Sequence, residues 1–464
     1  MVWTEQAGPT VDERRADGRA RRKAVPRSSH GQWAPAPDRP DPVALVEGQN
    51  EQRLRELLPV RRGRMVASPF TFYRGAARVM AWDLSATPDS GLTVQACGDA
   101  HLSNFGAYAS PERQLVFDVN DFDETLPGPW EWDLKRLAAS FTIAARQSGM
   151  AAADRASVTA EAVSSYRQAM ADFAEMGYLA LWYDTMSFEA LAEAPGLFID
   201  QRERERLDRF ARKARSKDNL QALHKLAVEV DGSYRIRSDP PVLVPLEEVP
   251  EGLPAGDLEA IVDAALDDYR ASLPDHRAAL LDRFTPVDIA LKVVGVGSVG
   301  TVCLVALLEG RDRDDPLFLQ IKEATRSVLA EHLPASRYRN HGRRVVEGQR
   351  LMQSASDVFL GWTRGAGGRD FYLRQLRDWK GSVDVEAMDV EALTRYARMC
   401  GWTLARGHAR SGDAVAIAAY VGAGTVLDQA LVEFSEAYAD QNEADHAEFA
   451  QAIADGRLEA DVEG

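Results

Sequence analysis

The sequence predicts an α+β protein in which a large helical lobe is joined to a small lobe built on an antiparallel sheet. Two observations lead to this fold class. Apolar residues recur at helical spacing over about 132–283 and again from 388 onward. Between these stretches, 285–383 holds short β-branched runs of strand length, separated by glycine and polar turns. The 464 residues also exceed one ordinary domain of roughly 100 to 200 residues, which favours two lobes.

The first part of the chain predicts a tail followed by helices. Residues 1–42 mix Arg, Asp, Pro and Ser without periodicity, so we expect a mobile basic and Pro-rich tail. Short helices are expected over 43–85. Two β-prone runs, Thr93–Cys97 and Gln114–Val119, then predict a hairpin flanked by loops. A helical body follows and completes a lobe over 43–284, with an extended break at 232–246.

The second part predicts the sheet lobe over 285–383. Three successive runs, Asp288–Val294, Thr301–Glu309 and Leu317–Ile321, have the pattern of an antiparallel meander. They are followed by a helix near 336–354, strands near 357–362 and 370–377, and a helix near 388–410. Residues 384–464 are expected to return to the helical lobe and to end in an acidic C-terminus, since Asp428–Gly464 holds eleven acidic residues and one Arg.

Composition excludes several classes of protein. A net charge of −16 argues against nucleic acid as a partner, because phosphate binding needs a basic surface. The longest apolar run, Ala414–Leu427, is shorter than the roughly 20 residues of a membrane span, so no membrane partner is expected. The first residues carry no secretory signal pattern, which predicts a cytoplasmic protein. Three distant cysteines exclude a disulfide framework and a structural zinc site.

The first motif that carries chemistry is a glycine-rich string. Gly295, Gly297 and Gly300 form a G-x-G-x-x-G pattern with Ser298, and the next residues have strand character rather than helical character. A dinucleotide site needs a helix directly after the glycines, whereas a protein-kinase glycine loop joins two strands over the nucleotide phosphates. The kinase arrangement therefore fits better. The alternative is a tight hairpin whose glycines have positive φ.

The second motif is Lys322, which ends the third predicted strand in LQIKEA. The chain has eight lysines and 47 arginines, so a lysine in an apolar strand is unusual here. Its place matches the kinase lysine that contacts phosphates, and Glu347 in the following helix is the candidate ion-pair partner. The alternatives are a lysine that extends to the sheet edge and a solvent-exposed helical glutamate.

The third motif combines a loop and a strand end. Asp99, His101 and Asn104 lie in GDAHLSN, and Asp118 and Asp121 lie in DVNDFDE. Phosphoryl transfer needs one carboxylate to accept the hydroxyl proton and separate oxygen ligands for Mg²⁺. Such residues also cap turns through side-chain hydrogen bonds, which is the structural alternative. We expect His101 to be a hydrogen-bonding support rather than a metal ligand, because no second His lies at a useful spacing.

These residues carry a resemblance. GDAHLSNFG and VNDFDE resemble the catalytic and metal loops of aminoglycoside and choline phosphotransferases, which have a protein-kinase-like fold. The resemblance implies that Asp99 is the catalytic base, that Asn104 and Asp121 bind Mg²⁺, that Lys322 binds ATP phosphates and that Asp133 supports the catalytic loop. Asp118 competes as a metal ligand, since the spacing from Asp99 to Asp121 is long. Almost the whole chain is also similar to a bacterial family known as domain of unknown function 2252.

The order of the motifs departs from the kinase order. In kinases the glycine loop and lysine precede the catalytic Asp, whereas Asp99 comes nearly 200 residues before Gly295. A circularly permuted kinase-like fold accounts for this order, because chain ends at a surface can be joined and a loop opened elsewhere. The expected activity is ATP- and Mg²⁺-dependent phosphoryl transfer to an unknown small-molecule or protein acceptor. Alternatives are a nucleotide-binding pseudokinase regulator and a metal-dependent phosphohydrolase built on Asp99, His101, Asp118 and Asp121.

Overall fold

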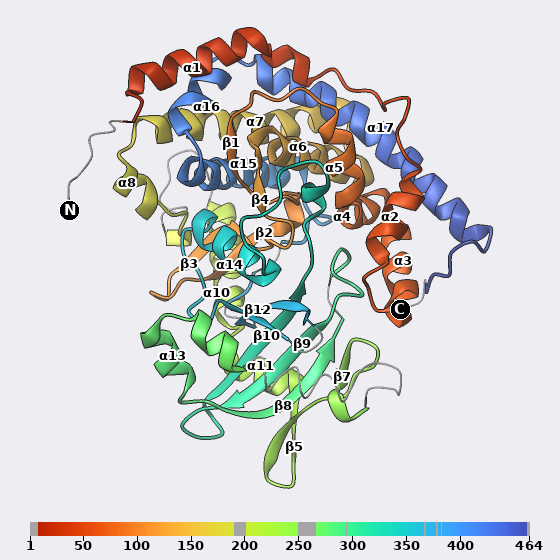
Figure 1. Ribbon diagram of the computed structural model, residues 1–464, viewed down its shortest axis with the longest axis vertical. Helices are drawn as coiled ribbons and strands as arrows, with labels where there is room; N and C mark the ends of the chain where they lie inside the picture. Colours follow the sequence, from red (N-terminus) through yellow and green to blue (C-terminus); the bar gives the residue numbers. More distant parts are fainter. Residues whose placement is uncertain are drawn as a thin grey trace.

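The computed structural model describes residues 8–189, 201–248, 266–293, 295–365, 368–376, 379–381 and 383–461. Helices fill one part of the molecule and a six-stranded sheet lies in the other (Figure 1). All the strand pairs in the described residues are antiparallel. The protein is thus a mixed α+β protein with small antiparallel sheets, as the sequence predicts.

The helical part is centred on four long helices, α6 (Trp130–Gln147), α7 (Ala152–Glu175), α15 (Val390–Ser411) and α17 (Val426–Ala454). Helix α6 packs against α7 and α17, and α7 also packs along α15 (Figure 1). Residues 130–145 of α6 are all buried, so this helix runs through the core instead of lying on it. The loop that carries Asp99 is anchored to α6.

The beginning of the chain differs from the prediction of a mobile tail. Residues Val11–Ala24 form helix α1, which starts with a capping box between Thr10 and Glu13. A Cβ atom at Gly18 would collide with the backbone oxygen of Ala416, so glycine allows α1 to lie directly on α16 (Ala414–Val421). Docking on α16 supplies the buried surface that the segment lacks by itself, and the tail prediction does not hold for this stretch.

The helices that directly follow α1 agree with the expected short helices over 43–85. They are α2 (Pro42–Asn50), α3 (Leu58–Val66), α4 (Pro69–Gly75) and α5 (Ala77–Ser85), followed later by α8 (Tyr178–Tyr183) and α10 (Gln201–Arg215). Within the described ranges, no single helix is long and apolar enough to cross a membrane, although α16 and α17 together meet that criterion across a bend of 82°.

The main sheet has the order β11-β12-β10-β9-β8-β7. Its strands are β7 (Leu243–Pro245), β8 (Thr285–Lys292), β9 (Cys303–Glu309), β10 (Pro316–Ala324), β11 (Gly361–Arg364) and β12 (Asp370–Gln375). The expected meander is confirmed, since β9 pairs with both β8 and β10. In this register Lys322 lies opposite Cys303 on β9 and Tyr372 on β12.

The two faces of the sheet are covered by different helices. On one face, α11 (Asn219–Leu226) packs in an apolar cluster with Val305, Leu307 and Phe318. The opposite face packs with α13 (Asp275–Leu281). Because side chains alternate along a strand, Lys322 shares the α11 face with Phe318. The lysine therefore points to the side of the sheet on which α11 lies.

Three two-stranded sheets complete the fold. Strand β1 (Thr93–Ala96) pairs with β4 (Leu126–Pro129), β2 (Phe105–Ala109) pairs with β3 (Leu115–Val119), and β5 (Ala227–Val230) pairs with β6 (Ser233–Ile236). The sequence predicted only one hairpin over 93–119, so β2 and β4 were missed. Their pairings place the loop after β1 beside the loop after β3. Helix α14 (His341–Met352) packs on β11 and β12 and closes the sheet toward these loops.

Candidate functional site

Asp133 on α6 anchors the loop after β1 through two hydrogen bonds. One oxygen of Asp133 accepts the backbone N–H of Cys97 at 2.7 Å, and the other accepts that of Gly98 at 2.9 Å. His408 of α15 contacts the same carboxylate through Nε2 at 3.2 Å. Gly98 has a φ of 83°, which glycine adopts without strain. Asp133 therefore fixes the backbone at the start of the loop that carries Asp99.

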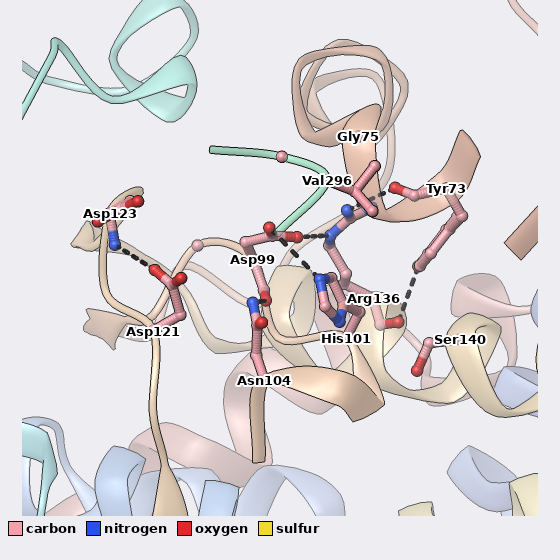
Figure 2. Close-up of polar contacts among 12 residues, drawn as sticks. Tyr73, Gly75, Asp99, His101, Asn104, Asp121, Asp123, Arg136, Ser140 and Val296 are labelled. Carbon is pink, nitrogen blue, oxygen red and sulfur yellow. Dashed lines mark hydrogen bonds and ion pairs between the residues drawn. The ribbon is translucent and has the colours of Figure 1, made fainter. Parts of the chain in front are cut away.

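Asp99 projects from this loop toward α6. Its Oδ1 lies 2.5 Å from Nε of Arg136, and its Oδ2 lies 3.7 Å from Nε2 of His101 (Figure 2). Arg136 is itself anchored by donation from Nη2 to the backbone oxygen of Tyr73 at 2.9 Å. Burial raises the pKa of Asp99, while the Arg136 guanidinium opposes that rise. Asp99 is therefore a partly buried carboxylate fixed in one orientation.

His101 is buried beneath the loop. Burial, together with the nearby cations Arg74 and Arg136, holds the pKa of His101 well below its usual range, so the imidazole is neutral. Its Nδ1 atom is buried without a hydrogen-bond partner. The ring contact to Asp99, at 3.7 Å, is longer than a hydrogen bond, so the supporting role of His101 stays a prediction.

Asn104 links the loop after β1 to the loop after β3. Its side-chain Nδ2 donates to the backbone oxygen of Asp99 at 2.8 Å, and its own backbone oxygen accepts the N–H of Asn120 at 2.7 Å. Asp121 follows directly, and its Oδ1 accepts the backbone N–H of Asp123 at 3.1 Å (Figure 2). These contacts bring Asp99, Asn104 and Asp121 to one pocket.

Lys322 on β10 contacts two carboxylates of this pocket from the side of the sheet. Its Nζ lies 3.5 Å from Oδ2 of Asp121 and donates a short hydrogen bond to Asp123. Tyr372 also donates to Asp123, at 2.7 Å. Burial alone would favour neutral lysine, but the two carboxylates outweigh it and raise the Lys322 pKa well above its usual range. Burial likewise opposes ionisation of Asp121, yet Lys322 and Arg374 lower its pKa.

The glycine-rich string lies over the same pocket. Gly295, Gly297 and Ser298 line it together with Asp99, and Gly295 and Gly300 have positive φ. A Cβ at Gly297 would lie 3.2 Å from the backbone oxygen of Arg74, so this position has little room for a side chain. The backbone of the glycine string therefore packs closely against α4.

Three arginines that the sequence did not single out hold the glycine string. Arg61 donates to the backbone oxygens of Val296 at 3.2 Å and Gly297 at 3.3 Å. Arg64 donates to the oxygen of Gly295 at 2.8 Å, and Arg53 donates to that of Val299 at 2.5 Å. Arginines that bind carbonyls across long sequence separations leave no local pattern, so they could not be predicted.

Glu347 does not have its expected role. The structure pairs it with Arg350, one turn along the same helix, at 3.5 Å, while Lys322 pairs with Asp121 and Asp123 instead. The residue of α14 that reaches the site is Arg344, which donates to the backbone oxygens of Thr125, Asp123 and Thr325 at 2.6, 2.8 and 2.9 Å. The loop carboxylates lie nearer to the lysine, and they take the place of the helix glutamate.

Asp118 is also used differently from the prediction of a competing metal ligand. Its two oxygens accept from Nη2 of Arg406 at 2.8 and 2.7 Å, and one also accepts the backbone N–H of Ser354 at 2.8 Å. Each side chain of the Arg406–Asp118 pair is only 1% exposed. Asp118 lies on β3 one residue before the strand ends and points into the core, so it supports the fold.

The pocket around Asp99 has the composition of a ligand site. Five carboxylates and two arginines line it: Asp99, Asp121, Asp123, Glu124, Glu323, Arg53 and Arg74. The Nε atoms of Arg53 and Arg74, like Nδ1 of His101, are buried without a hydrogen-bond partner. Buried polar atoms without partners are uncommon in folded proteins, and a ligand in contact with these atoms would supply the missing hydrogen bonds.

The residues present fit Mg²⁺ but not a site made wholly of protein ligands. In the part of the chain that the structure describes, no three His, Cys, Asp or Glu side chains converge as a metal cluster. Mg²⁺ usually takes one or two carboxylates and completes its shell with water and substrate phosphates. Asp121 is ionised, and Asn104 retains its side-chain oxygen as an acceptor, so these two supply suitable ligands.

The comparisons with known proteins identify a family. The model of the family described as an uncharacterized protein conserved in bacteria (DUF2252) matches residues 53–452. The chain belongs to this family. The match spans the loop of Asp99, the strand end of Asp121, the glycine string and Lys322. No curated protein and no solved structure matches the chain.

Proposed function

We propose that the protein transfers a phosphoryl group from ATP to a hydroxyl in a Mg²⁺-dependent reaction. The observation that carries this proposal is the meeting of Lys322 and Asp121, 3.5 Å apart, in a cleft shared with Asp99 and the glycine string. One such motif alone is weak, but phosphoryl transfer requires all of them around one nucleotide. Lys322 and Asp121 now pair with each other, and a phosphate group would bind the lysine while a metal cation would bind the aspartate.

The side chains divide the work of binding. Lys322 is a buried cation whose charge is kept by two carboxylates, and it would hold the nucleotide phosphates. Asp121 and Asn104 would hold Mg²⁺, which neutralises charge on the phosphates. Backbone N–H groups of the glycine string would contact the phosphate oxygens, because no side chain at the glycines blocks their approach.

Asp99 would act on the acceptor. Arg136 holds its Oδ1, and Oδ2 is then the atom that accepts the proton as the acceptor oxygen attacks the γ-phosphorus and the bond to ADP breaks. The pKa of Asp99 is raised by burial, which makes the carboxylate a better base than a solvated aspartate. Asn104 and Asp133 position the loop that carries it.

The order of the elements supports a permuted kinase-like fold as part of this proposal. From β8 to β12 the chain runs through strand, glycine string, strand, strand with Lys322, helix α14 and two further strands. This is the order of the kinase glycine loop, its lysine and the following helix. The loops with Asp99 and Asp121 come before this unit in the chain and meet it in space.

A second candidate function is nucleotide binding without transfer. The observation that favours it is the 2.5 Å ion pair between Asp99 and Arg136, which ties up one oxygen of the base. The third function considered from the sequence, a phosphohydrolase that uses Asp118, has less support because Asp118 is buried against Arg406. Mass-spectrometric detection of phosphorylated products from a panel of hydroxyl compounds with Mg²⁺ and ATP separates the candidates. ATP binding with no product across the panel would favour the regulator.

A further inference from the structure

A second cavity adjoins the pocket around Asp99 and has the opposite charge. The two share five residues, Arg74, Asn104, Asp121, Gly295 and Ser298, so they form one continuous cleft. Sixteen residues line the second cavity, and five of the eight lysines in the chain are among them. The cationic residues of this cavity are Lys217, Lys225, Lys292, Lys322, Lys380, Arg74 and Arg374, and Asp121 is the one carboxylate among its described lining residues.

This concentration of lysine is not explained by the composition of the chain. The protein has a net charge of −16, and arginine is its usual basic residue. Like charges gathered in one cavity repel one another. A cavity lined by one sign of charge attracts ligands of the opposite sign. Lysine is a compact point charge on a flexible stem, which suits phosphate groups at varied positions.

Helix α11 supplies one side of the cavity through a single stripe of residues. Its apolar residues Ala222, Leu223 and Leu226 are buried against the sheet. The lining residues Gln221, His224 and Lys225 follow the spacing i, i+3 and i+4, which is one face of the helix, and Lys217 lies just before its N-cap. Packing thus fixes the helix with its basic stripe toward the cavity. Lys217 is half-buried and Lys225 is exposed.

The nucleotide proposed above does not require this stripe. Lys322, Asn104 and Asp121 serve the phosphates and Mg²⁺ from β10 and the loops, and α11 belongs to neither. We propose that the α11 side of the cavity binds the acceptor, and that this acceptor is a small molecule already carrying two or more phosphate groups. The role of this molecule as phosphoryl acceptor rests on the proposed function, whereas the polyphosphate-binding site rests on the cavity itself.

The test uses inorganic tripolyphosphate as the probe, without nucleotide or Mg²⁺, and isothermal titration calorimetry at fixed ionic strength. Lys217→Gln/Lys225→Gln should weaken tripolyphosphate at least tenfold. The matched control is Lys23→Gln/Lys213→Gln, which removes the same charge from two exposed lysines outside the cavity and should change the affinity less than twofold. Raising KCl should weaken binding to the wild type, and this holds even if the α11 variant folds poorly.

The same proteins are then titrated with ATP and Mg²⁺. The inference predicts less than a threefold change for the α11 variant. Equal losses of ATP and tripolyphosphate would overturn it, because the stripe would then serve the nucleotide. Equal tripolyphosphate affinity in the α11 variant and its control would also overturn it. If the wild type binds tripolyphosphate through α11 but binds no ATP, the proposed function fails while the polyphosphate site stands.

Discussion

The Nζ atom of Lys322 lies 3.5 Å from Oδ2 of Asp121, although 201 positions separate them in the chain. The lysine comes from the third strand of the meander, and the aspartate comes from the loop after β3. Each has its pKa shifted toward the charged form by the other. This ion pair joins two chemical motifs beside a pocket whose lining arginines keep unpartnered donors.

Replacing Asp99 with Asn tests the base. Asn has nearly the same volume but cannot accept the proton, so the transfer rate should fall by about 10² to 10⁴. Arg136 would lose its counter-charge in the core, and the free energy of unfolding should fall by about 1–3 kcal/mol. Transfer rates and denaturant unfolding measure both effects. Asp172→Asn, on the exposed side of α7, is the control. Full activity in a folded Asp99→Asn variant would remove Asp99 from catalysis.

Replacing Asp118 with Asn separates support of the fold from metal binding. The buried partner Arg406 would be left without its charge, which should lower the free energy of unfolding by about 3 kcal/mol. The Mg²⁺ dependence of ATP affinity should stay within about threefold of the wild type under conditions where the variant is folded, because Asp118 points into the core. Loss of that dependence in Asp118→Asn would return Asp118 to the metal site.

Helix α14 offers a paired comparison of two of its residues. Glu347→Gln should change neither ATP affinity nor stability by more than about 0.5 kcal/mol, since its pair with Arg350 is half-exposed. Arg344→Met should weaken ATP binding, because it releases the three backbone oxygens that Arg344 holds beside the loop of Asp123. Calorimetry on both variants gives the comparison, and a larger loss from Glu347→Gln would restore the kinase-like pairing.

Glu124 predicts a pH effect on stability. Burial raises its pKa from 4.5 to about 7, so the folded state holds a proton that the unfolded chain releases near pH 4.5. Stability from this group is present at low pH and is lost as pH rises from about 4.5 to about 7, by about 3 kcal/mol. Glu124→Gln removes that loss. Its melting temperature relative to the wild type should therefore be higher at pH 8 than at pH 5, and an equal difference at both pH values would contradict the shift.

The sequence predicted those features that depend on residues close together in the chain. The period-two runs gave the meander of β8, β9 and β10, and the scarcity of lysine marked Lys322 as a functional candidate. The loop that carries Asp99 was found because its residue types serve one chemistry at short spacing. Its expected contact with α6 through Asp133 is also present.

Long-range partners were beyond the reach of the sequence. Arg136 and Arg406 look like ordinary helical arginines, and only the fold brings them to Asp99 and Asp118. Glu347 was assigned because kinases have a glutamate in the helix that follows the phosphate-binding lysine. The ion pair of Lys322 depends instead on how the loop after β3 approaches the sheet. Helix α1 was missed for the same reason, since its stability comes from docking on α16.

The most direct test of the central claim is the calorimetric titration of ATP into the protein with and without Mg²⁺. Mg²⁺ should tighten ATP binding at least tenfold in the wild type. Asp121→Asn should abolish that gain, and Lys322→Met should weaken ATP in both conditions. Asp172→Asn and Lys213→Met, both on exposed helix surfaces, should behave as the wild type. Unchanged ATP and Mg²⁺ affinity in folded Asp121→Asn and Lys322→Met proteins, or no ATP binding by the wild type, would contradict the account.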